Sequence, residues 1–254
     1  DISERKKAED EIRRKNEELQ KLNLEKDKFF SIISHDLRSP FNGILGLTSF
    51  MANDIKQLTY EEIQEISLNL NKSAKNFYRL LTNILEWAKM QGRLTEYNPE
   101  KLRLKKIVTE TINLFTETAN TKGIKIESDV ADDLEVITDQ FMLDTILRNL
   151  VSNAIKFTHK GGSLLITAKK DGSKTEIRIK DTGIGMSKNI LDNLFKIDSK
   201  QISRYGTDNE PGTGLGLILC KEFIDRHNGE LHVKSEEGKG SEFTIILKND
   251  PINK

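Results

Sequence analysis

The chain has 254 residues, of which 40 are Lys or Arg and 40 are Asp or Glu, so its formal net charge is zero. This balance disfavours nucleic-acid binding, which usually requires an excess of basic residues. The length allows one large domain or two smaller ones. Aromatic residues make up 6% of the chain and charged residues 31%, which indicates an aliphatic core beneath a highly charged surface.

The cysteine and hydropathy patterns restrict the setting of the chain. Cys220 is the single cysteine, which excludes an intrachain disulfide and any metal cluster built on several cysteines. We therefore expect a reducing, cytoplasmic setting, with Cys220 as a buried thiol in an apolar run. No stretch approaches the ~20 apolar residues of a membrane span, so no membrane contact is expected within these residues. The chain opens without Met or a signal peptide, and we expect it to be part of a longer protein.

Residues 1–28 are expected to form a charged signalling helix. Apolar residues recur at intervals of about 3.5 residues, which is typical of a short parallel coiled coil. A solvated single helix is the alternative. The apolar positions are Ala8, Ile12, Leu19, Leu22, Phe29 and Ile33. The stripe continues to about Asn53 and predicts one long helix containing Pro40, where proline removes a hydrogen bond and bends the axis.

A turn over residues 54–58 precedes a second predicted helix. Thr59 and Glu62 match a capping box, and apolar residues then recur at helical spacing from Ile63 to Ala88. Two antiparallel helices bury little apolar surface by themselves, whereas two such hairpins form a four-helix bundle. We therefore expect a homodimer, with residues 29–92 as the dimerisation domain.

Residues 93–99 read as a linker, and residues 100–250 as a second domain. Alternating runs around Asp171-Gly172 are a strong hairpin signal. The elements predicted here are helices over 104–120, 140–158 and 214–227, a strand over 124–127, and hairpins over 164–181 and 231–247. The predicted fold class is multidomain: an all-α helical hairpin followed by an α+β sandwich made of antiparallel strands and helices.

Three motifs in this second domain suit a bound nucleotide. Asn149 and Asn153 lie on one face of a predicted helix with Lys156 just beyond, and neutral oxygens beside a cation suit a metal–phosphate. In Asp181–Gly185 the glycines allow close approach to a flat ligand, and a buried carboxylate could accept a hydrogen bond from an exocyclic amine. The glycines of Gly212–Gly216 precede an apolar helix, whose amino-terminal end suits phosphates. Taken alone, each of the two glycine motifs is a weak signal.

The order and spacing of these motifs resemble the N, G1 and G2 boxes of the Bergerat-type ATP-binding fold. Histidine kinases, gyrase-type topoisomerases, Hsp90-type chaperones and mismatch-repair ATPases share that fold. Within this superfamily, Ser34-His-Asp-Leu-Arg-Ser-Pro40 resembles the H box of sensor histidine kinases. The resemblance covers residues 30 to about 248. The opening residues 1–8 are similar to the exit of a PAS sensor domain, which implies a sensor domain upstream.

The resemblance implies ATP and Mg²⁺ as cofactors. Asn149 would coordinate Mg²⁺, Asp181 would bind adenine N6, and the glycines of the last motif would cradle phosphates. Phe195 resembles the aromatic residue of an ATP lid over residues 187–211, which we expect to be mobile until nucleotide binds. The implied ATP-binding set is Asn149, Asn153, Lys156, Asp181, Gly183, Gly185, Phe195, Gly212, Thr213, Gly214, Leu215 and Gly216.

The same resemblance makes His35 the nucleophile. An imidazole with a pKa near ~6.5 is largely unprotonated at neutral pH and able to attack phosphorus. Asp36 would accept a hydrogen bond from the other ring nitrogen. Ser39 occupies the position where the family usually has Thr or Asn, which orients water for dephosphorylation of the partner regulator, so phosphatase activity stays open. The remaining histidines are expected to be surface or packing residues: His159, His227 and His232.

Together these features predict a sensor histidine kinase core. It would use Mg-ATP to phosphorylate His35 and pass the phosphoryl group to an Asp of a response regulator. The alternatives are a Bergerat-fold ATPase clamp or a nucleotide-binding scaffold, but such clamps lack the His35 motif and the hairpin. The chain departs from the family after Phe195, where Lys-Ile-Asp198 lacks the second aromatic residue of the lid.

Overall fold

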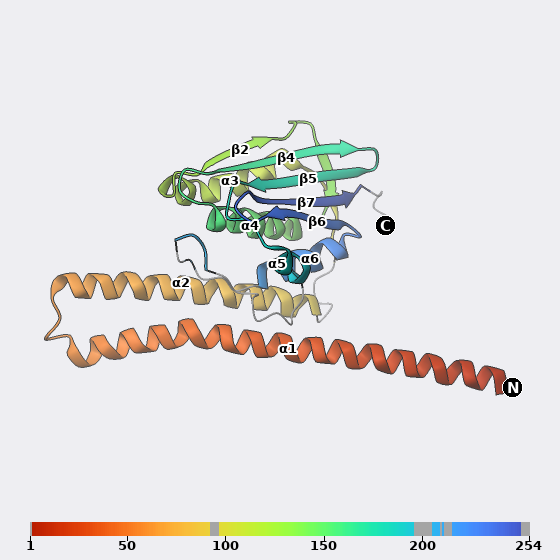
Figure 1. Cartoon of the computed structure of the whole chain (residues 1–254), viewed down its shortest axis with the longest axis horizontal. Helices are drawn as coiled ribbons and strands as arrows, with labels where there is room; N and C mark the ends of the chain where they lie inside the picture. Colours follow the sequence, from red (N-terminus) through yellow and green to blue (C-terminus); the bar gives the residue numbers. More distant parts are fainter. Residues whose placement is uncertain (1, 92–96, 196–204, 209, 211–214, 250–254) are drawn as a thin grey trace. The chain divides into compact units, whose positions relative to one another are not determined.

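The computed structural model describes residues 2–91, 97–195, 205–208, 210 and 215–249. The chain divides into two compact units, Asp1–Ala88 and Lys89–Lys254. The first unit is helical and the second combines helices with strands (Figure 1). The predicted fold class, a helical hairpin followed by an α+β domain, is therefore confirmed.

The first unit is an antiparallel pair of long helices. Helix α1 spans Ile2–Asp54 and continues through Pro40, as predicted, and α2 spans Tyr60–Gln91. A short turn joins them (Figure 1). The two helices contact each other through Phe41 and Phe77, whose ring centroids are 5.9 Å apart.

The predicted capping box begins α2. Thr59 N donates a hydrogen bond to Glu62 Oε2 at 2.8 Å, and Glu62 N donates to Thr59 Oγ1 at 3.2 Å. The hydrogen bonds from Thr59 lower the pKa of Glu62. Two backbone N–H groups that have no partner within the helix are satisfied in this way. The box is confirmed, and it fixes where the hairpin turn ends.

The second unit contains seven strands and four helices among the described residues. The strands are β1 Glu100–Arg103, β2 Lys125–Asp129, β3 Glu135–Thr138, β4 Ser163–Asp171, β5 Lys174–Asp181, β6 Glu230–Glu236 and β7 Gly240–Lys248. The helices are α3 Leu104–Thr121, α4 Gln140–Phe157, α5 Lys188–Asn193 and α6 Leu215–Arg226. The predicted helices and both hairpins are confirmed, with small differences at their ends.

The main sheet has five strands in the order β2-β4-β5-β7-β6. The pairs β4–β5, β5–β7 and β6–β7 are antiparallel, as expected. The strand β2, for which no pairing was predicted, pairs parallel with β4. The connection from β2 to β4 contains α4, and such a crossover is long enough to return the chain in the same direction.

Helix α4 is the centre of the second unit. It contacts α3 on one side and α6 on the other, and it also contacts β5 (Figure 1). Inward-facing Ile177 and Ile179 of β5 are fully buried, as are Leu143 and Ile146 of α4 and Phe223 of α6. The alternation of buried and exposed residues along β5 is the period-two pattern of a sheet covered on one face. The apolar core therefore holds α4 rigidly against the sheet.

Three short elements were not predicted. Strands β1 and β3 form a separate antiparallel pair, and α5 lies inside the segment predicted to be the lid. Each strand has only four residues, too few for a sequence period to appear, and β1 is largely exposed. Of the expected linker, residues 93–96 lie outside the described part of the chain.

The end of α6 and its cysteine agree with the sequence analysis. Asn228 has a φ of 50°, and Gly229 N donates to Ile224 O at 2.9 Å, which closes the helix at the predicted stop. Cys220 is fully buried, and burial raises the pKa of its thiol. No helix in the described ranges is long and apolar enough to cross a membrane.

Candidate functional site

Helix α4 presents the two amides that were predicted to bind a metal–phosphate. Its N-cap is Asp139, whose Oδ1 accepts a hydrogen bond from Met142 N at 3.0 Å. Asn149 and Asn153 are both half-buried. The Nδ2 of Asn149 donates to Thr145 O at 3.0 Å. This bond assigns the two ends of the amide and leaves Oδ1 as a hydrogen-bond acceptor beside the start of α6.

The first turn of α6 lies against Asn149. A Cβ added at Gly216 would lie 2.6 Å from Asn149 Oδ1, which is closer than side-chain atoms approach. A larger residue at position 216 would have to displace the Asn149 amide. The amino-terminal end of a helix carries N–H groups without intrahelical partners and the positive end of the helix dipole. The arrangement brings an anion-binding helix end beside an amide oxygen.

Asp181 ends β5 as a buried carboxylate, as predicted. It is 4% exposed, and its Oδ1 accepts hydrogen bonds from Gly183 N at 2.8 Å and Ser241 N at 3.1 Å. Burial raises the pKa of Asp181, although these two hydrogen bonds oppose the shift. Within the described residues, no hydrogen bond to its Oδ2 is found. That oxygen can accept a bond from a ligand amine.

The loop after Asp181 is held from two sides. On one side, a Cβ at Gly183 would lie 2.4 Å from Phe157 O at the end of α4, and Ile184 N donates to the same oxygen at 3.0 Å. On the other, a Cβ at Gly185 would lie 1.9 Å from Glu236 O in β6. Gly185 also has a φ of 64°, which other residues rarely adopt. The glycines of this motif are therefore required by close backbone packing.

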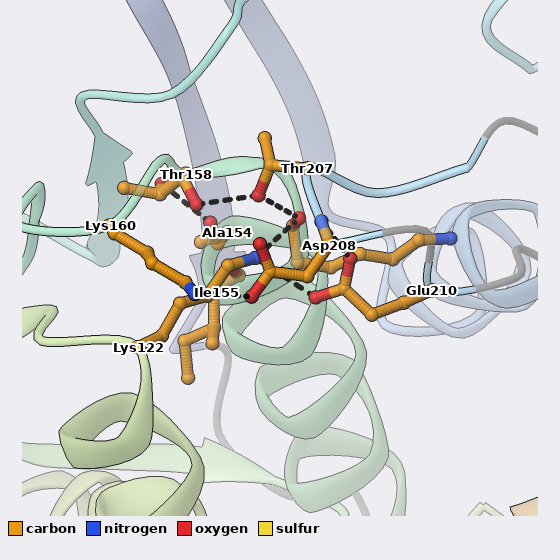
Figure 2. Close-up of polar contacts among 9 residues, drawn as sticks. Lys122, Ala154, Ile155, Thr158, Lys160, Thr207, Asp208 and Glu210 are labelled. Carbon is orange, nitrogen blue, oxygen red and sulfur yellow. Dashed lines mark hydrogen bonds and ion pairs between the residues drawn. The ribbon is translucent and has the colours of Figure 1, made fainter.

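The carboxyl-terminal end of α4 is closed by a buried lysine. Lys122 Nζ donates to Ile155 O at 3.0 Å, to Lys156 O at 3.0 Å and to Glu210 Oε1 at 2.9 Å (Figure 2). Thr207 lies on the same helix end, because its N donates to Lys156 O at 3.0 Å. Carbonyls that would lack partners at the end of the helix are satisfied by these groups. The sequence analysis did not assign these residues.

The three predicted motifs converge on α4. Asn149 contacts the start of α6, Lys156 contacts the loop before α6, and Phe157 contacts the loop after Asp181. Lys156 is itself buried, with its Nζ 4.8 Å from the centroid of the Phe157 ring. Phe195 is half-buried and follows α5. Residues that lie outside the described part of the chain are Gly212, Thr213 and Gly214, together with the side chain of Leu215.

The residues expected to accept the phosphoryl group belong to the first unit. His35, Asp36 and Ser39 all lie in α1. Their side chains are outside the described set, so their contacts stay predictions. Pro40 follows immediately and does not end the helix.

The other histidines are surface or packing residues, as predicted. His159 and His232 are exposed. His227 is buried, with Nδ1 2.6 Å from Phe223 O and Nε2 2.7 Å from Thr138 Oγ1. Asp139 N donates to the same Nε2 at 3.2 Å, so the neutral ring carries its proton on Nδ1. Burial lowers the pKa of His227.

Gly240 packs against Asp181, although the sequence indicates it only as part of a hairpin turn. It has a φ of 97°, and a Cβ there would lie 2.0 Å from Asp181 O. It also precedes Ser241, which donates to the Asp181 carboxylate. The Gly238-Lys-Gly240 turn was the available signal, but nothing local in it indicates contact with residues about sixty positions earlier.

The donor set fits a magnesium–nucleotide complex better than a metal held by protein alone. Over the described ranges, no group of three or more His, Cys, Asp or Glu side chains could hold a metal ion. Mg²⁺ is commonly bound by one or two protein oxygens together with water and substrate phosphates. Asn149 Oδ1, beside the start of α6, is an oxygen of the type that such a complex uses.

Two family models match the chain. Residues 25–93 match the His Kinase A (phospho-acceptor) domain, and residues 138–251 match the histidine kinase-, DNA gyrase B-, and HSP90-like ATPase. The aerobic respiration control sensor protein ArcB of Escherichia coli (strain K12) is 30% identical over 249 residues. The match covers 97% of this chain and 31% of ArcB, so the chain spans about a third of this curated relative.

Solved structures with the same fold include two histidine kinases. Full-length ShkA in complex with AMPPNP has a TM-score of 0.61 and 25% identity, covering 88% of this chain and 45% of ShkA. ThkA in complex with the response regulator protein TrrA has a TM-score of 0.67 and 20% identity, covering 89% of this chain and 62% of ThkA. The latter likeness concerns the fold alone.

Proposed function

Because the chain belongs to the sensor histidine kinases of two-component systems, we propose that it transfers the γ-phosphoryl group of Mg-ATP to His35 and then to an Asp of a response regulator. The observation that carries this proposal is the convergence of the three nucleotide motifs on α4. Asn149 lies in α4 and Gly216 packs against it, while Gly183, which donates a hydrogen bond to Asp181, packs on Phe157 O at the end of α4. A structural role alone does not require an amide, a buried carboxylate and a helix end at one place.

Each group has a distinct role in the proposed site. Asp181 accepts a hydrogen bond from the exocyclic amine of adenine through Oδ2. The amino-terminal end of α6 would bind phosphate oxygens, and Asn149 Oδ1 would hold the magnesium ion, with Asn153 and Lys156 in support. When bound, Mg²⁺ neutralises charge on the phosphates during transfer. Gly183 and Gly185 shape the adenine pocket, and Phe195, Gly212, Thr213, Gly214 and Leu215 complete the predicted set.

His35 is the proposed nucleophile. One unprotonated ring nitrogen attacks the γ-phosphorus, a nitrogen–phosphorus bond forms, and the bond to the bridging oxygen breaks so that ADP leaves. Asp36 accepts a hydrogen bond from the other ring nitrogen and stabilises the positive charge that develops on the imidazole. The phosphoryl group then moves to the carboxylate of the response regulator, a partner class supported by the ThkA–TrrA complex. Ser39 is the proposed position for a phosphatase activity.

The helical hairpin supports a homodimer. One copy leaves large apolar side chains exposed along α1 and α2, and a second hairpin would cover them as a four-helix bundle. These side chains include Phe41 at 47%, Leu45 at 48%, Phe50 at 48% and Leu85 at 53% exposure. We place the signalling coiled coil at 1–28, the dimerisation domain at 29–92, the linker at 93–99 and the catalytic domain at 100–250. A sensor domain of the PAS type before residue 1 and a cytoplasmic setting complete the proposal.

The proposal is tested with γ-labelled ATP and Mg²⁺. The chain should acquire acid-labile label, and His35→Gln should abolish it while leaving the affinity for ATP unchanged. His159→Gln is the matched control, because His159 is an exposed histidine outside the proposed site. Asn149→Asp should abolish the label by disturbing the metal–phosphate site.

The alternatives give different outcomes. Label that survives in His35→Gln would place the nucleophile elsewhere. Nucleotide hydrolysis without any labelled protein would indicate an ATPase clamp. Binding with neither label nor hydrolysis would indicate a scaffold.

A further inference from the structure

Lys122 is a buried cation that the proposed chemistry does not use. Its side chain is 4% exposed, and its Nζ bonds three oxygens, two of them carbonyls at the end of α4. A buried ammonium group is costly unless its charge is paired and its donors are satisfied. Glu210 supplies the paired charge at 2.9 Å. The pair joins residues 88 positions apart in the chain.

Glu210 in turn organises the loop that leads toward α6. Its Oε1 accepts from Lys122, and its Oε2 accepts from Asp208 N at 2.8 Å. Gly206 N donates to Glu210 O at 2.8 Å. Burial tends to raise the pKa of Glu210, but the hydrogen bonds from Lys122 and Asp208 outweigh it and lower the pKa. Glu210 is therefore held as a carboxylate with both oxygens occupied.

Thr207 fixes the same loop to α4 independently. Its Oγ1 lies 3.2 Å from Lys156 O and donates to Thr158 O at 2.9 Å (Figure 2). A Cβ at Gly206 would lie 2.6 Å from Lys156 Cγ, so the loop backbone packs directly on this lysine. The described part of the loop has one defined position on the end of α4.

The loop and α6 both contact α4, at two points on one helix. Thr207 contacts Lys156, and Gly216 contacts Asn149, seven residues earlier and about 10 Å along the helix. Five residues lie between Glu210 and Gly216, so the chain from one to the other reaches at most about 22 Å. The position of Glu210 therefore limits where α6 can begin relative to Asn149.

We propose that Lys122 and Glu210 are positioning residues that hold the amino-terminal end of α6 against Asn149, so that the site binds the phosphates of ATP. This proposal rests on the proposed nucleotide-binding function of the second unit. The pair acts on the phosphate end of the ligand only. The adenine end depends on Asp181, whose hydrogen bonds come from Gly183 and Ser241 and not from this loop.

The test compares ATP and AMP binding by calorimetric titration of the whole chain. In Glu210→Gln the dissociation constant for ATP should rise about tenfold, as expected for loss of one charged hydrogen bond, while that for AMP changes less than about twofold. A general effect on folding would lower the affinities for ATP and AMP equally. Asp181→Asn is the reciprocal variant, which should weaken ATP and AMP alike.

A matched control and a rescue complete the design. Glu135→Gln removes the exposed Lys101–Glu135 ion pair, whose atoms are 2.6 Å apart in the same unit, and should leave both affinities unchanged. Lys122→Arg keeps the charge and should retain more ATP affinity than Lys122→Met. In the Glu210→Gln variant, phosphorylation of His35 should show a raised KM for ATP and an unchanged kcat.

Two results would overturn the proposal. One is an unchanged ATP affinity in Glu210→Gln, and the other is an equal loss of ATP and AMP affinity. If the unaltered chain binds neither nucleotide, the proposed function itself fails. A chain that binds ATP but does not label His35 contradicts the kinase reaction and leaves the positioning role open to the same titration.

Discussion

The helical hairpin and the ATP-binding unit place their functional residues in different ways. In the hairpin, His35, Asp36 and Ser39 are neighbours within one helix, so sequence spacing defines their relation. In the second unit, Asn149, Asp181 and Gly216 come from separate elements and are positioned by tertiary contacts: Gly216 packs against Asn149, and Asp181 accepts a hydrogen bond from Ser241 N. The comparison teaches that a site on one helix tolerates changes in packing, whereas an assembled site depends on backbone contacts at a few glycines.

The largest expected effect is a loss of stability on replacing a glycine of the second unit, compared with a glycine of the hairpin. Gly185→Ala should destabilise the second unit by about 3 kcal/mol or more, because the new Cβ meets Glu236 O and the backbone is left-handed. Gly43→Ala in α1 should be neutral or stabilise the hairpin by up to ~1 kcal/mol, since its Cβ has ordinary contacts. Thermal unfolding followed by circular dichroism measures both, and equal effects would remove the contrast.

Asp181→Asn should lower the affinity for ATP without lowering the stability of the second unit. Loss of the carboxylate should weaken ATP binding by about 2 kcal/mol, because a hydrogen bond to a charged acceptor is lost. Burial raises the pKa of Asp181, so the protonated carboxyl stabilises the folded state at low pH. This stabilisation is lost as pH rises through the folded pKa, because the ionised carboxylate is disfavoured in the folded state. The variant should therefore be at least as stable as the unaltered chain at neutral pH. Titration calorimetry and denaturant unfolding test both parts, and a large loss of stability would contradict them.

Acid should affect the two units unequally. The pKa of His227 is lowered by burial, so the unfolded chain binds a proton more readily than the folded one. The stability of the second unit should fall as pH drops below about 6.5, by up to ~1.4 kcal/mol per pH unit until the folded pKa is reached. His227→Gln should flatten this dependence, and His232→Gln, at an exposed position, should not. Melting temperatures of the unaltered chain and both variants, measured between pH 5 and 8, test this pH dependence.

The smallest effect concerns the hairpin alone. Thr59→Ala removes the cap of α2 and should destabilise the hairpin by ~1 kcal/mol. ATP affinity should be unchanged, because the cap lies in the first unit. A loss of ATP affinity in this variant would show that the two units are energetically coupled. Unfolding curves and ATP titrations on the same preparation provide both readings.

Local patterns explain which parts of the fold could be predicted. The helices containing Asn149 and Cys220 have long apolar repeats, and the hairpin at Asp171-Gly172 has a specific turn signal. The burial of Asp181 and the stop at Asn228 also follow from local sequence. Strands β1 and β3 were missed because four residues are too few for a period to appear.

The contacts that hold the site together could not be predicted. Lys122 and Glu210 are 88 residues apart, and each lies in a polar context that gives no sign of burial. Gly240 and Asp181 meet because β5 and β7 are adjacent strands, a pairing that one sequence does not specify. The type of chemistry is therefore readable from motifs, while the contacts that position it arise from topology.

The reactivity of Cys220 can report how often α6 separates from α4 in this unit. The thiol is fully buried in α6, with Sγ 3.8 Å from Ile146 O of α4, and it is the chain's single cysteine. A thiol reagent can reach it only when α6 separates from α4, so the labelling rate reports how often that layer opens. If ATP binds at the start of α6 beside Asn149, as proposed, it should slow the reaction, and Cys220 would then report nucleotide occupancy without any added probe.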